Sequence, residues 1–337
     1  MPVSCQLCSR ESPIFLTAQD YNQGLSEAEF AYYRCPSCKI IFLSPVPDNL
    51  QDYYSSSYPA YQMPSLSDLN KMAEEERYKL DIVQQYAASG KLLEIGPAYG
   101  GFAYLAKKAG FEVDAIEMDA GCSAYLNTVI GVRCINDANI ETALHMLDTS
   151  FDVIVMWHVI EHLTNPWLIL EEITRKLKPE GVLVIAAPNP EALPFKTFGK
   201  YWTHLDAPRH LELIPKQLLS DHAHRYGLEE IFSSTKDKAS IVFSSFGWWM
   251  VSFRNAVRDI LHWPVTVNQE VTDTSPPRKI NSCTLMALAR SFGRFSAKAI
   301  RAIIMMVLRI FYKVILQPLE RTEGRGNAYT VVYRKSR

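Results

Sequence analysis

The segment from Lys91 to Phe102, KLLEIGPAYGGF, constrains the fold of this chain more than any other. Its apolar start predicts a short buried strand, its glycines predict a tight turn, and residues 102–109 predict the start of a helix. A strand, a glycine-rich loop and a helix in this order are typical of α/β sheets that bind a nucleoside or nucleotide. Ala98 occupies the middle glycine position of a nicotinamide-binding fingerprint, and the lysine of a phosphate-binding loop is absent.

Further apolar runs predict the rest of a sheet. The predicted strands are 111–117, 131–136, 151–156, 182–187, 228–234 and 330–334, and the predicted helices are 66–88, 138–147 and 166–177. Strands that alternate with helices form a doubly wound α/β sheet, which binds its ligand at the carboxyl ends of the strands.

Several motifs in order resemble those of class I S-adenosylmethionine (SAM)-dependent methyltransferases. Glu94-x-Gly96-x-Ala98-x-Gly100 resembles the first motif of that class, in which the middle position is usually glycine. The strand FDVI at 151–154, followed by HVIEHL at 158–163, resembles a branch that includes ubiquinone-type and sugar methyltransferases. The resemblance covers about residues 80–235 and recurs at 329–333. It implies an enzyme with a Rossmann-like seven-stranded sheet, an antiparallel last strand, and SAM as the cofactor.

The same resemblance implies where the cofactor binds. Glu94 would hold its amino group, and the bare backbone of the glycine loop would pass under its methionine part. Glu117 ends a strand, where a carboxylate reaches ribose hydroxyls; the alternative is a helix cap, a role that suits Asp119 better. Asp137 either accepts from the adenine amine or caps the helix that follows. The full set of cofactor-binding candidates is Glu94, Gly96, Pro97, Ala98, Gly100, Glu117, Met118, Asp137, Trp157 and His158.

Histidines supply the catalytic candidates, because the pKa of imidazole lies near neutrality. His210 is the predicted general base, with Asp206 or His204 orienting it, and His158 and His162 are further candidates. For each histidine, a structural role is an equally good interpretation. His158, Glu161 and His162 would share one helical face and offer metal ligands, although His158 stands where metal-dependent relatives carry an acid.

Two CxxC pairs precede the sheet. Cys5 and Cys8, together with Cys35 and Cys38, have the spacing of a zinc ribbon, and four thiolates would make the zinc structural. The alternatives are unliganded thiols or a redox pair. The tyrosines between this module and the sheet either close over the cofactor or acceptor, or pack the module onto the core; they are Tyr53, Tyr54, Tyr58 and Tyr61.

A long insertion separates the sixth strand from the last. Within it, residues 291–319 predict a basic amphipathic helix, with Lys298, Arg301, Arg309 and Lys313 among apolar residues. Such a helix either contacts an anionic membrane surface or covers the core. The predicted organisation is a zinc-ribbon-like module at 1–62, a SAM-binding core at 63–240, a helical insertion at 241–326 and the last strand at 327–337.

Charge and composition narrow the function. The formal net charge is -1, so no global positive field attracts nucleic acid, and no nucleic-acid partner is expected. The N-terminus shows no basic stretch followed by an apolar run, which predicts a cytoplasmic protein, with peripheral contact at the inner membrane face through 291–319. The predicted acceptor is a sugar, a sugar nucleotide or a lipid-linked glycan precursor. Alternatives are a zinc-bearing RNA methyltransferase and a non-catalytic binding module; O-, N- and C-methylation all stay open.

Overall fold

A seven-stranded sheet forms the centre of the molecule. The computed structural model describes residues 2–54, 61–242, 245–260, 303 and 305–337. Across the sheet the strands are β12 (Leu228–Ser234), β13 (Ala328–Lys335), β10 (Leu177–Pro188), β9 (Phe151–Trp157), β6 (Gly90–Ile95), β7 (Phe111–Glu117) and β8 (Arg133–Asn136). Only β13 in this sheet runs antiparallel to its neighbours, β10 and β12. The predicted doubly wound sheet with an antiparallel last strand is confirmed.

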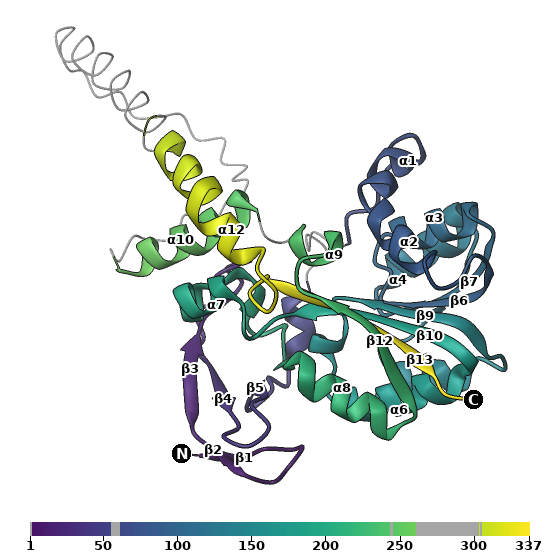
Figure 1. Cartoon of the computed structure of the whole chain (residues 1–337), viewed down its shortest axis with the longest axis horizontal. Coiled ribbons are helices and arrows are strands. Elements are labelled where there is room, and N and C mark those ends of the chain that lie inside the picture. The colour runs from purple at the N-terminus through teal and green to yellow at the C-terminus, as the bar shows by residue number, and fades with distance from the viewer. Residues whose placement is uncertain (1, 55–60, 243–244, 261–302, 304) are drawn as a thin grey trace, which may run out of the picture.

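Helices cover both faces of the sheet (Figure 1). One face carries α1 (Leu66–Glu75), α2 (Arg77–Val83), α3 (Gly101–Lys108) and α4 (Ala120–Tyr125), and the other carries α5 (Ile140–His145), α6 (Pro166–Lys176) and α8 (Lys216–Arg225). Neighbouring residues of a strand point to opposite faces, so Leu92 packs in one apolar core and Leu93 in the other. The helix predicted over 66–88 is in fact two helices, which meet at Glu76.

The order of the strands creates one reversal point. From β6 the chain moves outward through β7 to β8, and it then returns to β9 on the other side of β6. In open α/β sheets a ligand binds outside the carboxyl ends of the strands at such a point. The loops that follow β6, β7 and β9 therefore form the expected ligand edge.

A second sheet joins the N-terminal region to the core. Its order is β11 (Glu212–Leu213), β5 (Ile41–Leu43), β4 (Phe30–Arg34) and β3 (Ile14–Ala18), all antiparallel. The short β1 (Val3–Ser4) and β2 (Glu11–Ser12) form a separate hairpin, and η1 (Leu50–Tyr53) follows the sheet. Because β11 lies in the core sequence and pairs with β5, the N-terminal region and the loop after β10 share one sheet.

The loop after β10 and the C-terminal insertion contain short helices. These are α7 (Leu193–Phe198), η5 (Gly199–Tyr201), η6 (Thr203–Leu205), α9 (Lys238–Ile241), α10 (Phe246–Ile260), and η7 (Tyr312–Leu316) continuing into α12 (Gln317–Glu320). The first part of the segment predicted as a basic amphipathic helix, residues 291–302 with Lys298 and Arg301, lies outside the described residues, as does residue 304. Its described part, 305–320, is helical as expected.

A buried ion network fastens the two sheets together. Arg209 is fully buried; its Nη2 donates to Asp20 Oδ1 at 2.6 Å and to Asp206 Oδ1 at 2.7 Å, and its Nη1 donates to the carbonyl of Tyr53 at 3.3 Å. Asp20 follows β3, whereas Arg209 and Asp206 belong to the loop that leads to β11. The network therefore links the N-terminal region to the loop that carries His204 and His210.

Replacement of this arginine should destabilise the whole chain. Arg209→Ala leaves two buried carboxylates without their cation, and loss of one partner of a buried pair costs about 3–5 kcal/mol. Urea denaturation measures this change. The matched control is Arg77→Ala, which removes an exposed pair with Glu74 and should leave the free energy of unfolding within experimental error. An equal effect of the two substitutions would contradict the assigned role.

Candidate active site

The loop after β6 runs too close to its neighbours for side chains at two positions. A Cβ on Gly96 would lie 2.6 Å from Cγ2 of Val159, and one on Gly100 would lie 2.5 Å from Cδ2 of Leu126. Ala98 has a φ of 53°, a left-handed conformation that favours glycine. Ala98 therefore replaces glycine without changing the turn, and the loop still presents bare backbone at the carboxyl edge of the sheet.

Glu117 lies beside this loop, as the sequence predicts. Its Oε2 accepts from the backbone N–H of Ala98 at 2.9 Å, and its Oε1 accepts from the N–H of Asp119 at 2.8 Å. The helix-cap alternative is wrong, because Asp119 caps α4 by accepting from the N–H of Cys122. Burial raises the pKa of Glu117, and the two N–H groups act in the opposite direction. Each carboxylate oxygen keeps a lone pair for a hydroxyl.

Two buried polar atoms at this edge have no hydrogen-bond partner among the described residues. They are Oε2 of Glu94 and Nε1 of Trp157. Burial raises the pKa of Glu94 to about 8. The ring of Trp157 lies 5.7 Å from that of Phe102, at the start of α3. Buried polar groups are normally paired, so these atoms fit a site that is completed by a polar ligand. A carboxylate acceptor, an indole donor and a bare loop are suited to a nucleoside that carries an amino acid.

The remaining cofactor candidates follow the same edge. Asp137 follows β8 and accepts from the N–H of Asn139 at 2.8 Å, and Asn139, not Asp137, caps α5. The helix-cap alternative for Asp137 is therefore wrong. Met118 follows Glu117, and its carbonyl accepts from Nδ2 of Asn136 at 3.0 Å. The carbonyl of Pro97 accepts from the N–H of Gly100 at 2.9 Å, which closes the loop turn.

A histidine cluster follows β9. Residues 158–162 do not form the predicted α-helical face: His158 has a φ of 58° and precedes a three-residue 3-10 helix, η4 (Ile160–His162). The turn nevertheless brings Nδ1 of His158 to 3.4 Å from Oε1 of Glu161. His210 enters from the loop before β11, with Nε2 at 3.9 Å from the same Oε1 and its ring 4.6 Å from that of His162.

Backbone carbonyls hold two of these histidines. Nδ1 of His210 lies 2.8 Å from the carbonyl of His204, and Nδ1 of His162 lies 2.9 Å from the carbonyl of Arg209. A carbonyl only accepts, so each Nδ1 carries a proton and each Nε2 is left as the basic nitrogen. Of the two predicted orienting residues, His204 acts through its backbone. The carboxylate of Asp206 does not reach the imidazole of His210, because it binds Arg209 and Asn22. The backbone carbonyl of Asp206 accepts from the N–H of His210 at 3.2 Å.

One tyrosine of the group that precedes the sheet reaches this cluster. The hydroxyl of Tyr54 lies 3.0 Å from Nδ1 of His162, and the two rings stand edge to face. Tyr53 is buried against Phe30 instead. Tyr58 lies outside the described residues. Tyr53 therefore packs within the N-terminal region, and Tyr54 lies next to the histidine cluster.

The cluster keeps His210 uncharged at neutral pH. Burial and the neighbouring His162 lower the pKa of His210 to about 4. Burial alone would raise the pKa of Glu161, but the imidazoles of His158, His210 and His162 lower it to about 2. At pH 7 the cluster therefore contains a carboxylate beside a proton-free imidazole nitrogen. This arrangement can accept a proton and stabilise the resulting imidazolium.

Among the described residues, two groups of side chains have the geometry of metal ligands. Ligand atoms of Glu161, His162 and His210 lie within 4.8 Å of one another, so His210 joins the predicted metal group in place of His158. The second group contains the four N-terminal cysteines, with Sγ–Sγ distances of 3.7 Å between Cys5 and Cys38 and 3.4 Å between Cys8 and Cys35. A tetrahedral zinc with bonds of about 2.3 Å needs sulfurs about 3.8 Å apart. The cysteines fit zinc.

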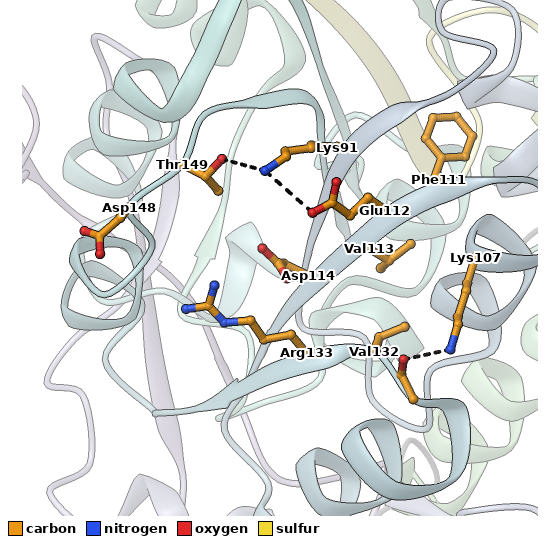
Figure 2. Close-up of a pocket in the computed structure, with 11 residues that line it drawn as sticks. Lys91, Lys107, Phe111, Glu112, Val113, Asp114, Val132, Arg133, Asp148 and Thr149 are labelled. Carbon is orange, nitrogen blue, oxygen red and sulfur yellow. Dashed lines mark hydrogen bonds and ion pairs between the residues drawn. The ribbon is translucent and has the colours of Figure 1, made fainter.

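A cavity of about 470 Å³ lies at the opposite edge of the sheet (Figure 2). It is lined by the amino ends of β6, β7 and β8, and Lys91 there contacts Thr149 and Glu112. Lys107, at its rim, donates to the carbonyls of Ile130 and Gly131, which come shortly before β8 in the chain. Cations and acids alternate around this cavity, which is separated by the sheet from the glycine loop. It therefore does not form part of the candidate active site.

The comparison with known families settles the class. Residues 71–233 match the family model described as a methyltransferase domain. The strand order and the glycine loop agree with that match. Residues 71–233 form a SAM-dependent methyltransferase domain. The chain is therefore an enzyme, and the alternative of a non-catalytic binding module is set aside.

Individual relatives of this methyltransferase are remote. A demethylmenaquinone methyltransferase from Renibacterium salmoninarum is 26% identical over 218 residues, which cover 62% of this chain and 87% of the relative. A SAM-dependent methyltransferase structure from Archaeoglobus fulgidus is 18% identical, with a TM-score of 0.46 and coverage of 78% and 94%. A phospholethanolamine N-methyltransferase 2 structure from Haemonchus contortus is 14% identical, with a TM-score of 0.47 and coverage of 88% and 62%.

Substitution of Glu117 should weaken SAM binding. Glu117→Gln keeps the shape but removes the charge that would hold the ribose hydroxyls. Hydrogen bonds to charged groups contribute about 1.5–3 kcal/mol, so the Kd should rise about 10- to 100-fold. Isothermal titration calorimetry with SAM measures this. The control, Glu112→Gln, lies on the same strand at its other end and should leave the Kd unchanged. An unaltered Kd in a folded Glu117→Gln protein would show that the carboxylate does not bind the cofactor.

Proposed function

We propose that this enzyme transfers the methyl group of SAM to a small-molecule acceptor of the sugar class: a sugar, a sugar nucleotide or a lipid-linked glycan precursor. The observation that carries the proposal is the cluster of Glu161, His162 and His210, in which Glu161 and His210 are buried, at the same sheet edge as the glycine loop. The motif HVIEHL at 158–163 resembles the branch that contains sugar methyltransferases. The curated relative is named for demethylmenaquinone, and this supports a small-molecule acceptor.

In this proposal, different residues at the carboxyl edge hold different parts of the cofactor. When bound, SAM supplies an electrophilic methyl group. Gly96 and Gly100 leave room for its methionine part, and Oε2 of Glu94 accepts from its amino group. Glu117 accepts from the ribose hydroxyls. Met118 would contact the adenine, and Asp137 would accept from the adenine amine. Positioning supplies much of the acceleration, because methyl transfer is an in-line displacement.

The acceptor side needs a base when the nucleophile is a hydroxyl. In this proposal Nε2 of His210 accepts the hydroxyl proton. The carbonyl of His204 holds the opposite nitrogen, and the carboxylate of Glu161 stabilises the imidazolium that forms. Tyr54 and His162 lie next to this position and would contact the acceptor.

A second candidate function is methyl transfer to RNA, in which the cysteine module would bind the RNA. The overall charge of -1 and the few cations of the module argue against it. We therefore expect no nucleic-acid partner. We also propose that the enzyme acts in the cytoplasm and contacts the inner face of the membrane peripherally. No helix among the described residues is long and apolar enough to cross a membrane.

The test is transfer of a labelled methyl group. The enzyme is incubated with methyl-labelled SAM and, separately, with sugar nucleotides, a lipid extract and RNA; label should enter the sugar-bearing fractions. His210→Asn should lower kcat about 10²- to 10⁴-fold, the usual contribution of a general base, with the Kd for SAM unchanged. The control His224→Asn, at an exposed position on α8, should keep full activity. Label in RNA alone would reject the sugar proposal.

The pH profile supplies an independent check of the base. Because the pKa of His210 is lowered to about 4, this histidine stays uncharged, with Nε2 unprotonated, down to about that pH. The value of kcat/KM should therefore show no loss from His210 protonation between pH 5 and 7. An acidic limb with a pKa near 6.5 that disappears in His210→Asn would contradict the lowered value.

We also propose that Cys5, Cys8, Cys35 and Cys38 bind structural zinc. Purified protein should contain about one zinc per chain, because four thiolates fill a tetrahedral site. Cys8→Ser should lower the zinc content and destabilise the N-terminal region, since metal binding contributes to folding of such modules. Elemental analysis and thermal unfolding measure both effects. The control Cys122→Ser lies outside the cluster, and equal zinc loss in both variants would refute the assignment.

A further inference from the structure

The C-terminal helix presents an apolar surface that the rest of the described chain does not cover. Between residues 303 and 319, eight large apolar side chains are each 39% to 67% exposed. They are Ile303, Met306, Val307, Ile310, Phe311, Val314, Ile315 and Leu319, and we term them the apolar face. Scattered exposed apolar residues are normal, but a contiguous group marks an interaction site.

This helix is held to the protein along one side. Tyr312 is buried, its ring lies 5.8 Å from Phe246 and 6.3 Å from Trp249 of α10, and its hydroxyl donates to Glu320 at 3.0 Å. Figure 1 shows the helix leading away from the body of the molecule. The contacts of Tyr312 with α10 therefore hold the helix to the rest of the protein, whereas its bond to Glu320 lies within the helix, and the apolar face stays open to solvent.

The segment of sequence that contains the apolar face carries charges of a single sign. Residues 290–319 contain six basic residues and no Asp or Glu: Arg290, Arg294, Lys298, Arg301, Arg309 and Lys313. Arg309 and Lys313 are exposed on the described helix, and neither forms an ion pair with another described residue. Because the whole chain has a net charge of -1, this positive region is a local feature. Its charge is complementary to an anionic surface.

We propose that the apolar face is a membrane-docking surface for anionic lipid. The apolar side chains enter the boundary between headgroups and acyl chains, and Arg309 and Lys313 extend to the headgroup phosphates. A second copy of the chain is a poorer occupant. In a symmetric dimer the same patches face each other, so the basic regions would meet. A lipid surface buries the apolar face and neutralises the cations together.

Docking at this face also bears on the acceptor, a step that rests on the proposed function. The helix packs on α10, and α10 contacts the loop after β10: the ring of Trp248 lies 5.3 Å from that of His204, and Oγ of Ser252 accepts from the N–H of Thr203 at 3.2 Å. His204 in turn holds His210. A single helix, α10, therefore separates the docked helix from the loop that carries His204 and His210. Among the proposed acceptors, this placement selects the lipid-linked glycan precursor.

Vesicle co-sedimentation tests the docking. The full chain is mixed with phosphatidylcholine vesicles that contain or lack phosphatidylglycerol. Wild type should bind the anionic vesicles and lose binding as NaCl rises. Ile310→Asp with Val314→Asp should lower partitioning about tenfold or more, because charges enter the buried face. The matched control, Val129→Asp with Met146→Asp, places the same charges at exposed apolar positions on the core and should bind like wild type.

Three results would overturn the inference. The first is that wild type binds neither kind of vesicle, and the second is that the control variant loses as much vesicle binding as the Ile310→Asp, Val314→Asp variant. The third is that wild type binds no vesicles but self-associates in analytical ultracentrifugation, and that the Ile310→Asp, Val314→Asp variant does not self-associate. Calorimetry with SAM on the same samples separates the two proposals. If a folded variant keeps its affinity for SAM but loses vesicle binding, the substitutions have affected the docking face alone. If the protein binds vesicles but has no affinity for SAM, the proposed function is rejected and the docking proposal is not.

Discussion

The pairing of β6 with a parallel strand on each side determines where the chemistry lies. Ile95 is in register with Ile116 of β7 and with Met156 of β9. One residue further along each strand stand Gly96, Glu117 and Trp157. Because parallel strands keep this register, the glycine loop, the carboxylate of Glu117 and the buried indole of Trp157 emerge in one row at the carboxyl edge. A slip of one residue in either pairing would send Glu117 or Trp157 to the other face of the sheet.

The N-terminal region takes part in building the other half of the site. The loop after β10 carries His204 and His210, and by itself a loop of this kind would be poorly fixed. Its last residues form β11 on the N-terminal sheet, and Arg209 is buried between Asp20 and Asp206. The carbonyl of the same Arg209 holds His162. Stability of the N-terminal sheet and orientation of the histidines are therefore linked.

The proposed zinc site and the docking face extend this arrangement at two ends of the chain. The cysteines would stabilise a module too small to bury much apolar surface of its own. The helix 305–320 would place the acceptor side next to a lipid surface through α10. In both proposals, an element at the periphery would affect the position of the histidine loop through packing contacts and would contribute no reacting group.

The sequence alone determined the strands, the glycine turn, the acidic strand end at Glu117 and the cysteine pairs. Each of these depends on the spacing of residues close together in the chain, which periodicity and turn chemistry make visible. Only the tertiary structure decided that the carboxylate of Asp206 binds Arg209 rather than the imidazole of His210, that Asn139 caps α5, and that residues 160–162 form a 3-10 helix. It also brought Asp20 to Arg209 and Tyr54 to His162, pairs separated by 189 and 108 residues. Contacts over such separations depend on how layers pack, and no local pattern encodes them.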